Sequence, residues 1–145
     1  MRAVVLAFVV ALMSSGCGSG ALSAIRGKAA QDMACPEKDL AVNPVYDYAG
    51  APNESGAYYA EGCQKLRRYE VGCNAFGYCP DPHGVDIQEL LLRQAAFDLK
   101  CEQDSISTQR LNRDTFGARG CDQQASYILL CGRRSCRVVQ NTQSQ

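Results

Sequence analysis

The sequence predicts an α+β fold of two tandem, disulfide-rich repeats, in which each repeat packs one helix against a small antiparallel sheet. Two observations carry this prediction. The chain of 145 residues contains nine cysteines, and this content is high for a protein kept in a reducing compartment. Eight of the nine fall into two sets of four with similar spacing, and other residues recur at matching positions around each set. The sequence therefore indicates an internal duplication.

The two repeats align when Cys35 is placed over Cys101. Residues 29–35 and 95–101 both read Ala-Ala-x-Asp-apolar-x-Cys, and both copies later read aromatic-x-Ala-x-Gly-Cys up to the second cysteine. The cysteines that follow these motifs are Cys63, Cys73 and Cys79 in the first copy and Cys121, Cys131 and Cys136 in the second. The first copy has eight more residues between its first two cysteines, and this excess lies around residues 48–56, where turn-forming residues predict an extended hairpin loop.

The first sixteen residues have the features of a signal peptide. Arg2 provides a positive charge, residues 4–13 are an unbroken apolar run, and residues 14–16 are small. A run of ten residues is too short to cross a bilayer as a helix. We therefore expect the protein to be exported.

The end of this segment resembles the lipobox of bacterial lipoproteins, because a small residue, Gly16, precedes Cys17. The resemblance implies that Cys17 carries diacylglycerol through a thioether and becomes the new N-terminus. It also implies sorting to the outer membrane, because Gly18 is not the aspartate that retains such proteins at the inner membrane. Ser14 departs from the usual leucine, and cleavage at residues 19–21, which would remove Cys17, stays open.

The chain as a whole resembles uncharacterised cysteine-rich bacterial lipoproteins, a resemblance that implies no mechanism. The expected order is a signal peptide at residues 1–16, a lipid-anchored tether at 17–27, the first repeat at 28–79, a linker at 80–85, the second repeat with its helix at 86–139, and a flexible tail at 140–145. Lipidation of Cys17 would leave eight cysteines, an even number that can pair completely.

An amphipathic helix is predicted over residues 86–97. Asp86 and Glu89 have the spacing of a capping box, and apolar residues then recur at helical intervals. The matching helix over residues 22–31 is a weaker prediction because Gly27 interrupts it. The strands predicted after these helices are 39–46, 57–63 and 68–73 in the first repeat, and 105–111, 115–121 and 126–131 in the second, with an edge strand at 137–139.

Repeats of this size bury little apolar surface, so cross-links are expected to stabilise them. The start of the first strand of a hairpin lies beside the end of the second, and short turns separate the remaining cysteines. The pairs predicted on this basis are Cys35 with Cys63, Cys101 with Cys121, Cys73 with Cys79, and Cys131 with Cys136.

No recognisable catalytic, metal or cofactor site is predicted. There is no Cys-x-x-Cys knuckle for zinc or thiol redox chemistry, and the one histidine, His83, lies in a Pro- and Gly-rich segment typical of an exposed loop. Asp32 and Asp98 recur in both copies, as expected of a helix-end or turn role. The formal charge without residues 1–16 is fourteen basic against fifteen acidic residues, or −1, so no nucleic-acid partner is expected.

Basic residues cluster at similar places in both repeats. They form either a solvated surface or contacts with an anionic lipid, a cell-envelope glycan or another envelope protein. These residues are Lys65, Arg67, Arg68, Arg133, Arg134 and Arg137. The function expected from the sequence is thus a non-enzymatic binding or structural module, lipid-anchored in the bacterial envelope. The alternative is a small envelope hydrolase or a protease-inhibitor-like domain, with residues 48–57 as the inhibitory loop.

Overall fold

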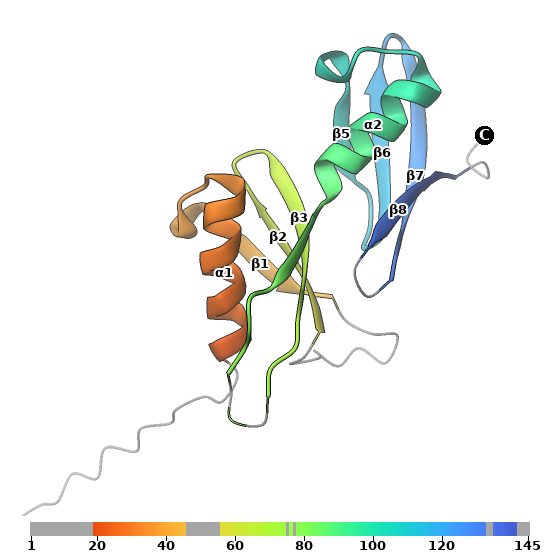
Figure 1. Ribbon diagram of the computed structural model, residues 1–145. Helices are drawn as coiled ribbons and strands as arrows, with labels where there is room; N and C mark the ends of the chain where they lie inside the picture. The colour runs from red at the N-terminus through yellow and green to blue at the C-terminus, as the bar shows by residue number, and fades with distance from the viewer. Residues whose placement is uncertain (1–18, 46–55, 75, 77, 133–134, 142–145) are drawn as a thin grey trace, which may run out of the picture.

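The computed structural model describes residues 19–45, 56–74, 76, 78–132 and 135–141 (Figure 1). It contains two units of the same architecture, each with one long helix and a four-stranded antiparallel sheet. The first unit consists of α1 (Ser19–Met33), η1 (Glu37–Asp39), β1 (Ala41–Pro44), β2 (Gly56–Gly62), β3 (Lys65–Val71) and β4 (His83–Asp86). The second consists of α2 (Ile87–Leu99), η2 (Gln103–Ser105), β5 (Ser107–Arg110), β6 (Thr115–Gly120), β7 (Gln123–Cys131) and β8 (Cys136–Gln140). The predicted α+β class with two tandem helix-and-sheet units is therefore confirmed.

Each sheet is a simple meander, because its strands pair in sequence order from β1 to β4 and from β5 to β8. The pairing register is the same in both units: Tyr58 lies opposite Tyr69 in the first, and Phe116 lies opposite Tyr127 in the second. The predicted edge strand is present as β8, which also takes in Gln140, a residue expected in the tail. All eight cysteines outside residue 17 lie in the four predicted disulfide pairs.

Helix α2 begins as its sequence predicts. The Asp86 carboxylate accepts a hydrogen bond from the Glu89 amide at 2.9 Å and so satisfies one of the amides that have no partner within the helix. The helix ends at Leu99, and the left-handed φ of 50° at the next residue, Lys100, closes the last turn. Ala34 has a φ of 48° at the same place after α1. Both helices therefore end two residues before the first cysteine of their repeat.

Helix α1 is longer than expected and extends back into the segment expected to be a tether. It buries Ala21, Ile25, Ala29 and Met33, which recur every four residues along one face. Gly27 costs a helix about 1 kcal/mol relative to alanine, and burial of this stripe against the first sheet outweighs that penalty. The weak sequence signal therefore reflected the local propensity of the segment, and tertiary packing decides its structure.

The repeated Gly-Cys pair is explained by the hairpin that it forms. A side chain on Gly62 would place its Cβ 2.5 Å from the carbonyl oxygen of Asp39, so no other residue fits without a shift of the backbone. The next two residues, Cys63 and Gln64, have φ values of 49° and 60°, the paired left-handed conformation of a type I′ turn. The second unit repeats this arrangement from Gly120 to Asp122.

The segment 80–85, expected to be a linker, belongs in part to the first sheet. His83, Gly84 and Val85 form β4 and pair with β3. Gly84 is required there, because a Cβ at this position would lie 2.6 Å from the ring of the buried Tyr69. Proline and glycine usually mark a loop, and for this reason the strand was not predicted from the sequence. Since Asp86 ends β4 and also caps α2, the two units are joined without a linker.

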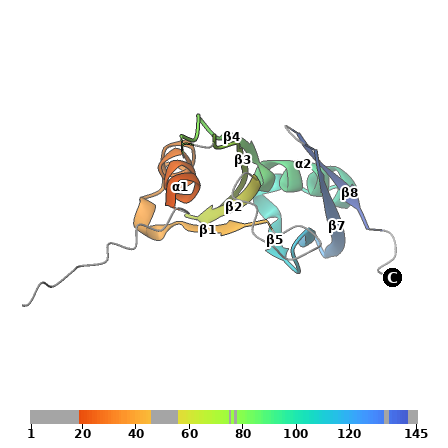
Figure 2. The same ribbon diagram turned by 90° about the horizontal axis from the view of Figure 1, so that it is seen from below.

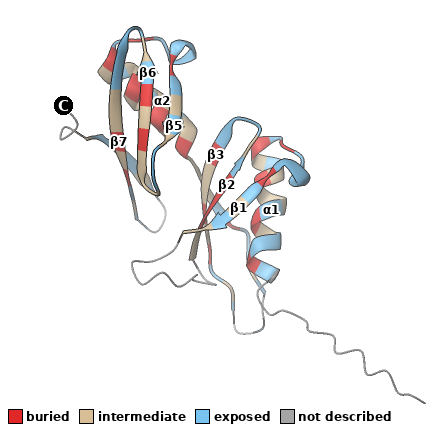
Figure 3. Ribbon diagram, turned by 180° about the vertical axis from the view of Figure 1, so that it is seen from behind, coloured by how far each residue is buried: buried red, intermediate tan, exposed pale blue. Residues whose placement is uncertain are grey.

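The second unit contacts the face of the first sheet that α1 does not cover. Helix α1 covers one face of the first sheet, and the second unit lies against the opposite face (Figures 1 and 2). Tyr59 and Leu66 of that opposite face join the core formed by α2 and the second sheet. The outward face of the second sheet carries the exposed residues Leu130 and Val139. Figure 3 shows buried positions alternating with partly buried ones along β6.

Candidate functional site

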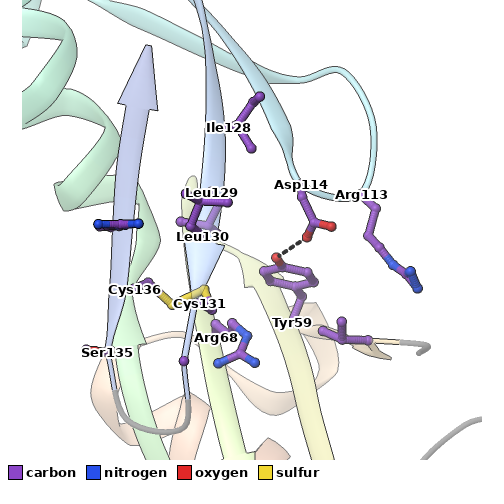
Figure 4. Close-up of a pocket in the computed structure, with 13 residues that line it drawn as sticks. Tyr59, Arg68, Arg113, Asp114, Ile128, Leu129, Leu130, Cys131, Ser135 and Cys136 are labelled. Atoms are coloured by element: carbon purple, nitrogen blue, oxygen red, sulfur yellow. Dashed lines mark hydrogen bonds between the residues drawn. A yellow bond between two sulfur atoms is a disulfide. The ribbon is translucent and has the colours of Figure 1, made fainter. Parts of the chain in front are cut away.

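The candidate site is a pocket of about 750 Å³ between the two units. Strands β2 and β3 supply one wall, and the β5–β6 turn, β7 and β8 supply the other (Figure 4). A volume of this size is in the range of pockets that hold small molecules. Its lining residues are Val45, Tyr59, Arg68, Arg113, Asp114, Ile128, Leu129, Leu130, Cys131, Gly132, Ser135, Cys136 and Arg137.

Tyr59 connects the two walls of this pocket. Its hydroxyl group donates a hydrogen bond to the Asp114 carboxylate at 3.2 Å, as the dashed line in Figure 4 shows. The guanidinium group of Arg110 lies over its ring, 4.6 Å from the centroid. Burial, and then the charge of Asp114, raise the pKa of Tyr59 to about 12. The hydroxyl therefore stays protonated at neutral pH and fixes the orientation of Asp114.

Three arginines give the pocket a positive lining. Arg68 projects from β3, Arg113 from the β5–β6 turn and Arg137 from β8, and together with Asp114 they sum to a formal charge of +2. Arg68 also forms an ion pair with Glu70 at 2.8 Å, which holds its guanidinium group in place. Arg137 is exposed. The arrangement favours an anionic group, because guanidinium groups donate paired hydrogen bonds to carboxylates, phosphates and sulfates.

The part of the pocket lining that β7 supplies is apolar. Ile128 and Leu130 lie on the outward face of β7, and Leu130 keeps 41% of its surface exposed. The Cys131–Cys136 disulfide closes this side next to Arg68, as seen in Figure 4. A ligand with an anionic group and an adjoining apolar part would match the two halves of this lining.

The structure divides the predicted basic cluster into two groups. Arg68 and Arg137 line the pocket, whereas Lys65 donates a hydrogen bond to the carbonyl of Met33 at 2.7 Å and Arg67 reaches the carbonyl of Asp32 at 3.5 Å. Cations at these carbonyls stabilise the C-terminal end of α1. Lys65 and Arg67 thus have a structural role that accounts for their charge.

Several predicted sites lie outside the described residues. Arg133 and Arg134 are among them, although their described neighbours Gly132 and Ser135 line the pocket. Cys17 and most of the expected inhibitory loop, residues 48–55, also lie outside. The structure therefore adds nothing to those predictions.

The aspartate that recurs in both repeats faces a buried tyrosine in each unit. The Tyr69 hydroxyl group donates to Asp32 at 3.1 Å, and Lys28 forms an ion pair with the other oxygen of that carboxylate. In the second unit, burial and then the charge of Asp98 raise the pKa of Tyr127 to about 12. The hydrogen bond of the first unit joins the end of α1 to the first sheet, whereas the Asp98 carboxylate accepts from Gln94 of its own helix at 3.1 Å. Both aspartates lie near the end of their helix, as the sequence predicted.

The remaining titratable groups that the structure describes include His83, the one histidine of the chain. His83 lies in β4 opposite Glu70. Within the described part of the chain, no group of three or more His, Cys, Asp or Glu residues is placed to hold a metal ion. Among the same residues, no helix is long and apolar enough to span a bilayer.

Sequence reasoning missed Arg113, Asp114 and the apolar wall of β7. Arg113 and Asp114 form a short polar turn between strands, and such turns are common on protein surfaces. Their importance comes from Tyr59, which is 55 positions from Asp114 in the sequence. Comparison with protein-family models, curated proteins and solved structures finds no match to this chain.

Proposed function

We propose that this protein is an exported bacterial envelope protein, anchored to the outer membrane by lipid on Cys17, and that it acts as a non-enzymatic binding module for an anionic ligand. The observation that carries the proposal is the pocket between the units, where three arginines and an apolar wall converge. A cell-envelope glycan with acidic groups, an anionic lipid or an acidic segment of another envelope protein would supply the matching chemistry.

The geometry supports binding because the pocket is preorganised. Tyr59 and Asp114 join the two walls, Glu70 holds Arg68, and a disulfide holds β7 to β8. A ligand that enters such a site loses less binding energy to the ordering of protein side chains. Asp114 is the one carboxylate among the described lining residues, and three arginines outnumber it, so the net positive charge of the lining favours an anion.

Export is supported by the cysteines. Four disulfides in a chain of this length are typical of proteins that fold in an oxidising compartment. The pairing leaves Cys17 as the one remaining cysteine. An exported protein rarely keeps an unmodified thiol, and lipidation at Cys17 accounts for it.

We expect the pocket to bind the fluorescent anion 8-anilinonaphthalene-1-sulfonate, which combines a sulfonate with an apolar ring system. Replacing either Arg113 or Arg137 by glutamine should weaken this binding about ten-fold, because each loses a charge-assisted hydrogen bond. The measurement is a fluorescence titration that gives the dissociation constant of each variant.

The matched control is Arg93→Gln on α2. Arg93 is 63% exposed and does not line the pocket, so this variant should bind the dye like the parent protein. The uncharged dye without its sulfonate should bind much more weakly to the parent. Equal losses in the Arg93 and Arg137 variants would refute a specific site, since they would show that only the overall charge matters.

The anchoring is tested by the intact mass of protein extracted from membranes of the producing bacterium, measured under denaturing and non-reducing conditions. We expect the mass of residues 17–145 with an acylated glycerol, lowered by eight hydrogens for the four disulfides. A chain that starts after residue 17 would refute the lipid anchor but would leave the pocket proposal intact.

A further inference from the structure

The ring closed by the Cys73–Cys79 disulfide presents two exposed aromatic side chains. Phe76 is 96% exposed and Tyr78 is 68% exposed. Large apolar side chains lose favourable burial when they stand in water. The two cysteines that close this loop are six positions apart. We call the two exposed side chains, Phe76 and Tyr78, the aromatic tip.

The tip is held in shape by more than the disulfide. The Asn74 carboxamide oxygen accepts hydrogen bonds from the backbone amides of Phe76 and Tyr78, each at 3.0 Å. The Asn74 amide in turn donates to the carbonyl of Tyr78 at 2.9 Å. These hydrogen bonds hold the backbone at Phe76 and Tyr78 while their side chains are exposed, so less conformational entropy is lost when a surface covers them.

The fold does not require aromatic residues at this place. The equivalent ring in the second unit, between Cys131 and Cys136, contains glycine, arginine and serine only. Both rings connect the third and fourth strands of their sheets. Since the second ring closes without aromatic residues, Phe76 and Tyr78 are available for a role outside the fold.

The position of the tip indicates what covers it. Figures 1 and 2 show the β3–β4 connection beside the first turn of α1, and Ala21 of that turn shares a core with Val71, Cys73 and Cys79. Helix α1 begins at Ser19, only two residues after Cys17. A lipid on Cys17 would hold this end of the molecule, and with it the aromatic tip, next to the bilayer.

We propose that Phe76 and Tyr78 insert into the interfacial region of the phospholipid bilayer and orient the protein on it. This inference rests on the anchoring proposed above. Aromatic rings favour the boundary between headgroups and acyl chains. The diacylglycerol on Cys17 would attach the protein to the membrane through two acyl chains but would not set the orientation of the folded units. Insertion of the aromatic tip beside the anchored end of α1 would set that orientation.

The absence of tryptophan from the chain allows a direct test. Phe76→Trp places a single fluorophore in the tip, and Phe97→Trp places one on α2, where Phe97 is 80% exposed and lies in the other unit. Each full-length protein, extracted from bacterial membranes, is reconstituted into vesicles of phosphatidylethanolamine and phosphatidylglycerol with brominated acyl chains. Bromine quenches tryptophan only at close range.

We expect the tryptophan at position 76 to be quenched several-fold more than the one at position 97, with a blue shift of its emission in vesicles without bromine. Equal quenching at the two positions would overturn the proposed insertion. The intact mass of the same samples reports separately on Cys17. An acylated chain with equal quenching would thus refute the insertion alone, and an unacylated chain with strong quenching at position 76 would refute the anchor alone.

Discussion

Replacing Tyr59 by alanine is expected to lower the free energy of unfolding by about 3–5 kcal/mol, the range for removing a large aromatic side chain from a core. Tyr59 is 2% exposed and belongs to the core shared by both units. The substitution removes its packing, its contact with Arg110 and its hydrogen bond to Asp114 together. Urea unfolding followed by far-UV circular dichroism measures the loss.

The control is Tyr59→Phe, which keeps the ring and removes only the hydroxyl group. Its cost should be about 1 kcal/mol, the net value of one hydrogen bond. The same variant should weaken dye binding in the pocket, because Asp114 is then free to turn toward Arg113. If the alanine variant proves no less stable than the phenylalanine variant, the ring does not hold the units together.

Removing the Cys35–Cys63 disulfide with two alanines should destabilise the protein by about 3–4 kcal/mol, since the loop-entropy relation gives this value for the 28 residues that it closes. Removing Cys73–Cys79 should cost only about 2 kcal/mol, because its loop spans 6 residues. Cys35 is also buried, so the first substitution leaves unfilled space in the core. Equilibrium unfolding of both double variants under non-reducing conditions gives the two losses.

A matched comparison comes from the second unit. Its bonds Cys101–Cys121 and Cys131–Cys136 close loops of 20 and 5 residues, so the same order of effects should recur there. A larger loss for the short loops in both units would contradict the entropic explanation and would indicate that local strand pairing depends on them.

The duplication made much of the fold accessible from the sequence. Two repeated residues have a clear geometric reason: a side chain at Gly62 would collide with a backbone carbonyl, and Cys63 occupies a turn with positive φ. These constraints are local or lie within one unit, so they recur in both copies and stand out from the background. The disulfide pairs followed from the same hairpin geometry.

Arg68 and Arg137 were predicted as contacts for an anion, but their assembly with Tyr59, Arg113 and Asp114 into one pocket was not, because the pocket lies where the two copies differ. Tyr59 and Arg68 in the first unit correspond to Gly117 and Ser126 in the second, so alignment of the repeats does not mark them. Which face of the first sheet receives the second unit depends on the passage from β4 into α2, and the Pro- and Gly-rich sequence concealed that strand. The relative placement of two sheets is a long-range property that residue patterns do not encode directly.

The last strand of each sheet has an equivalent place, because β8 pairs with β7 as β4 pairs with β3, and β4 leads directly into α2. The outward face of the first sheet offers Tyr59 and Leu66 to the next helix, whereas the equivalent positions of the second sheet are Gly117 and Gln124. A further unit placed against the second sheet would have no large apolar side chains to pack against at these two positions. Extending the protein into a longer array would therefore first require large apolar residues at these two positions.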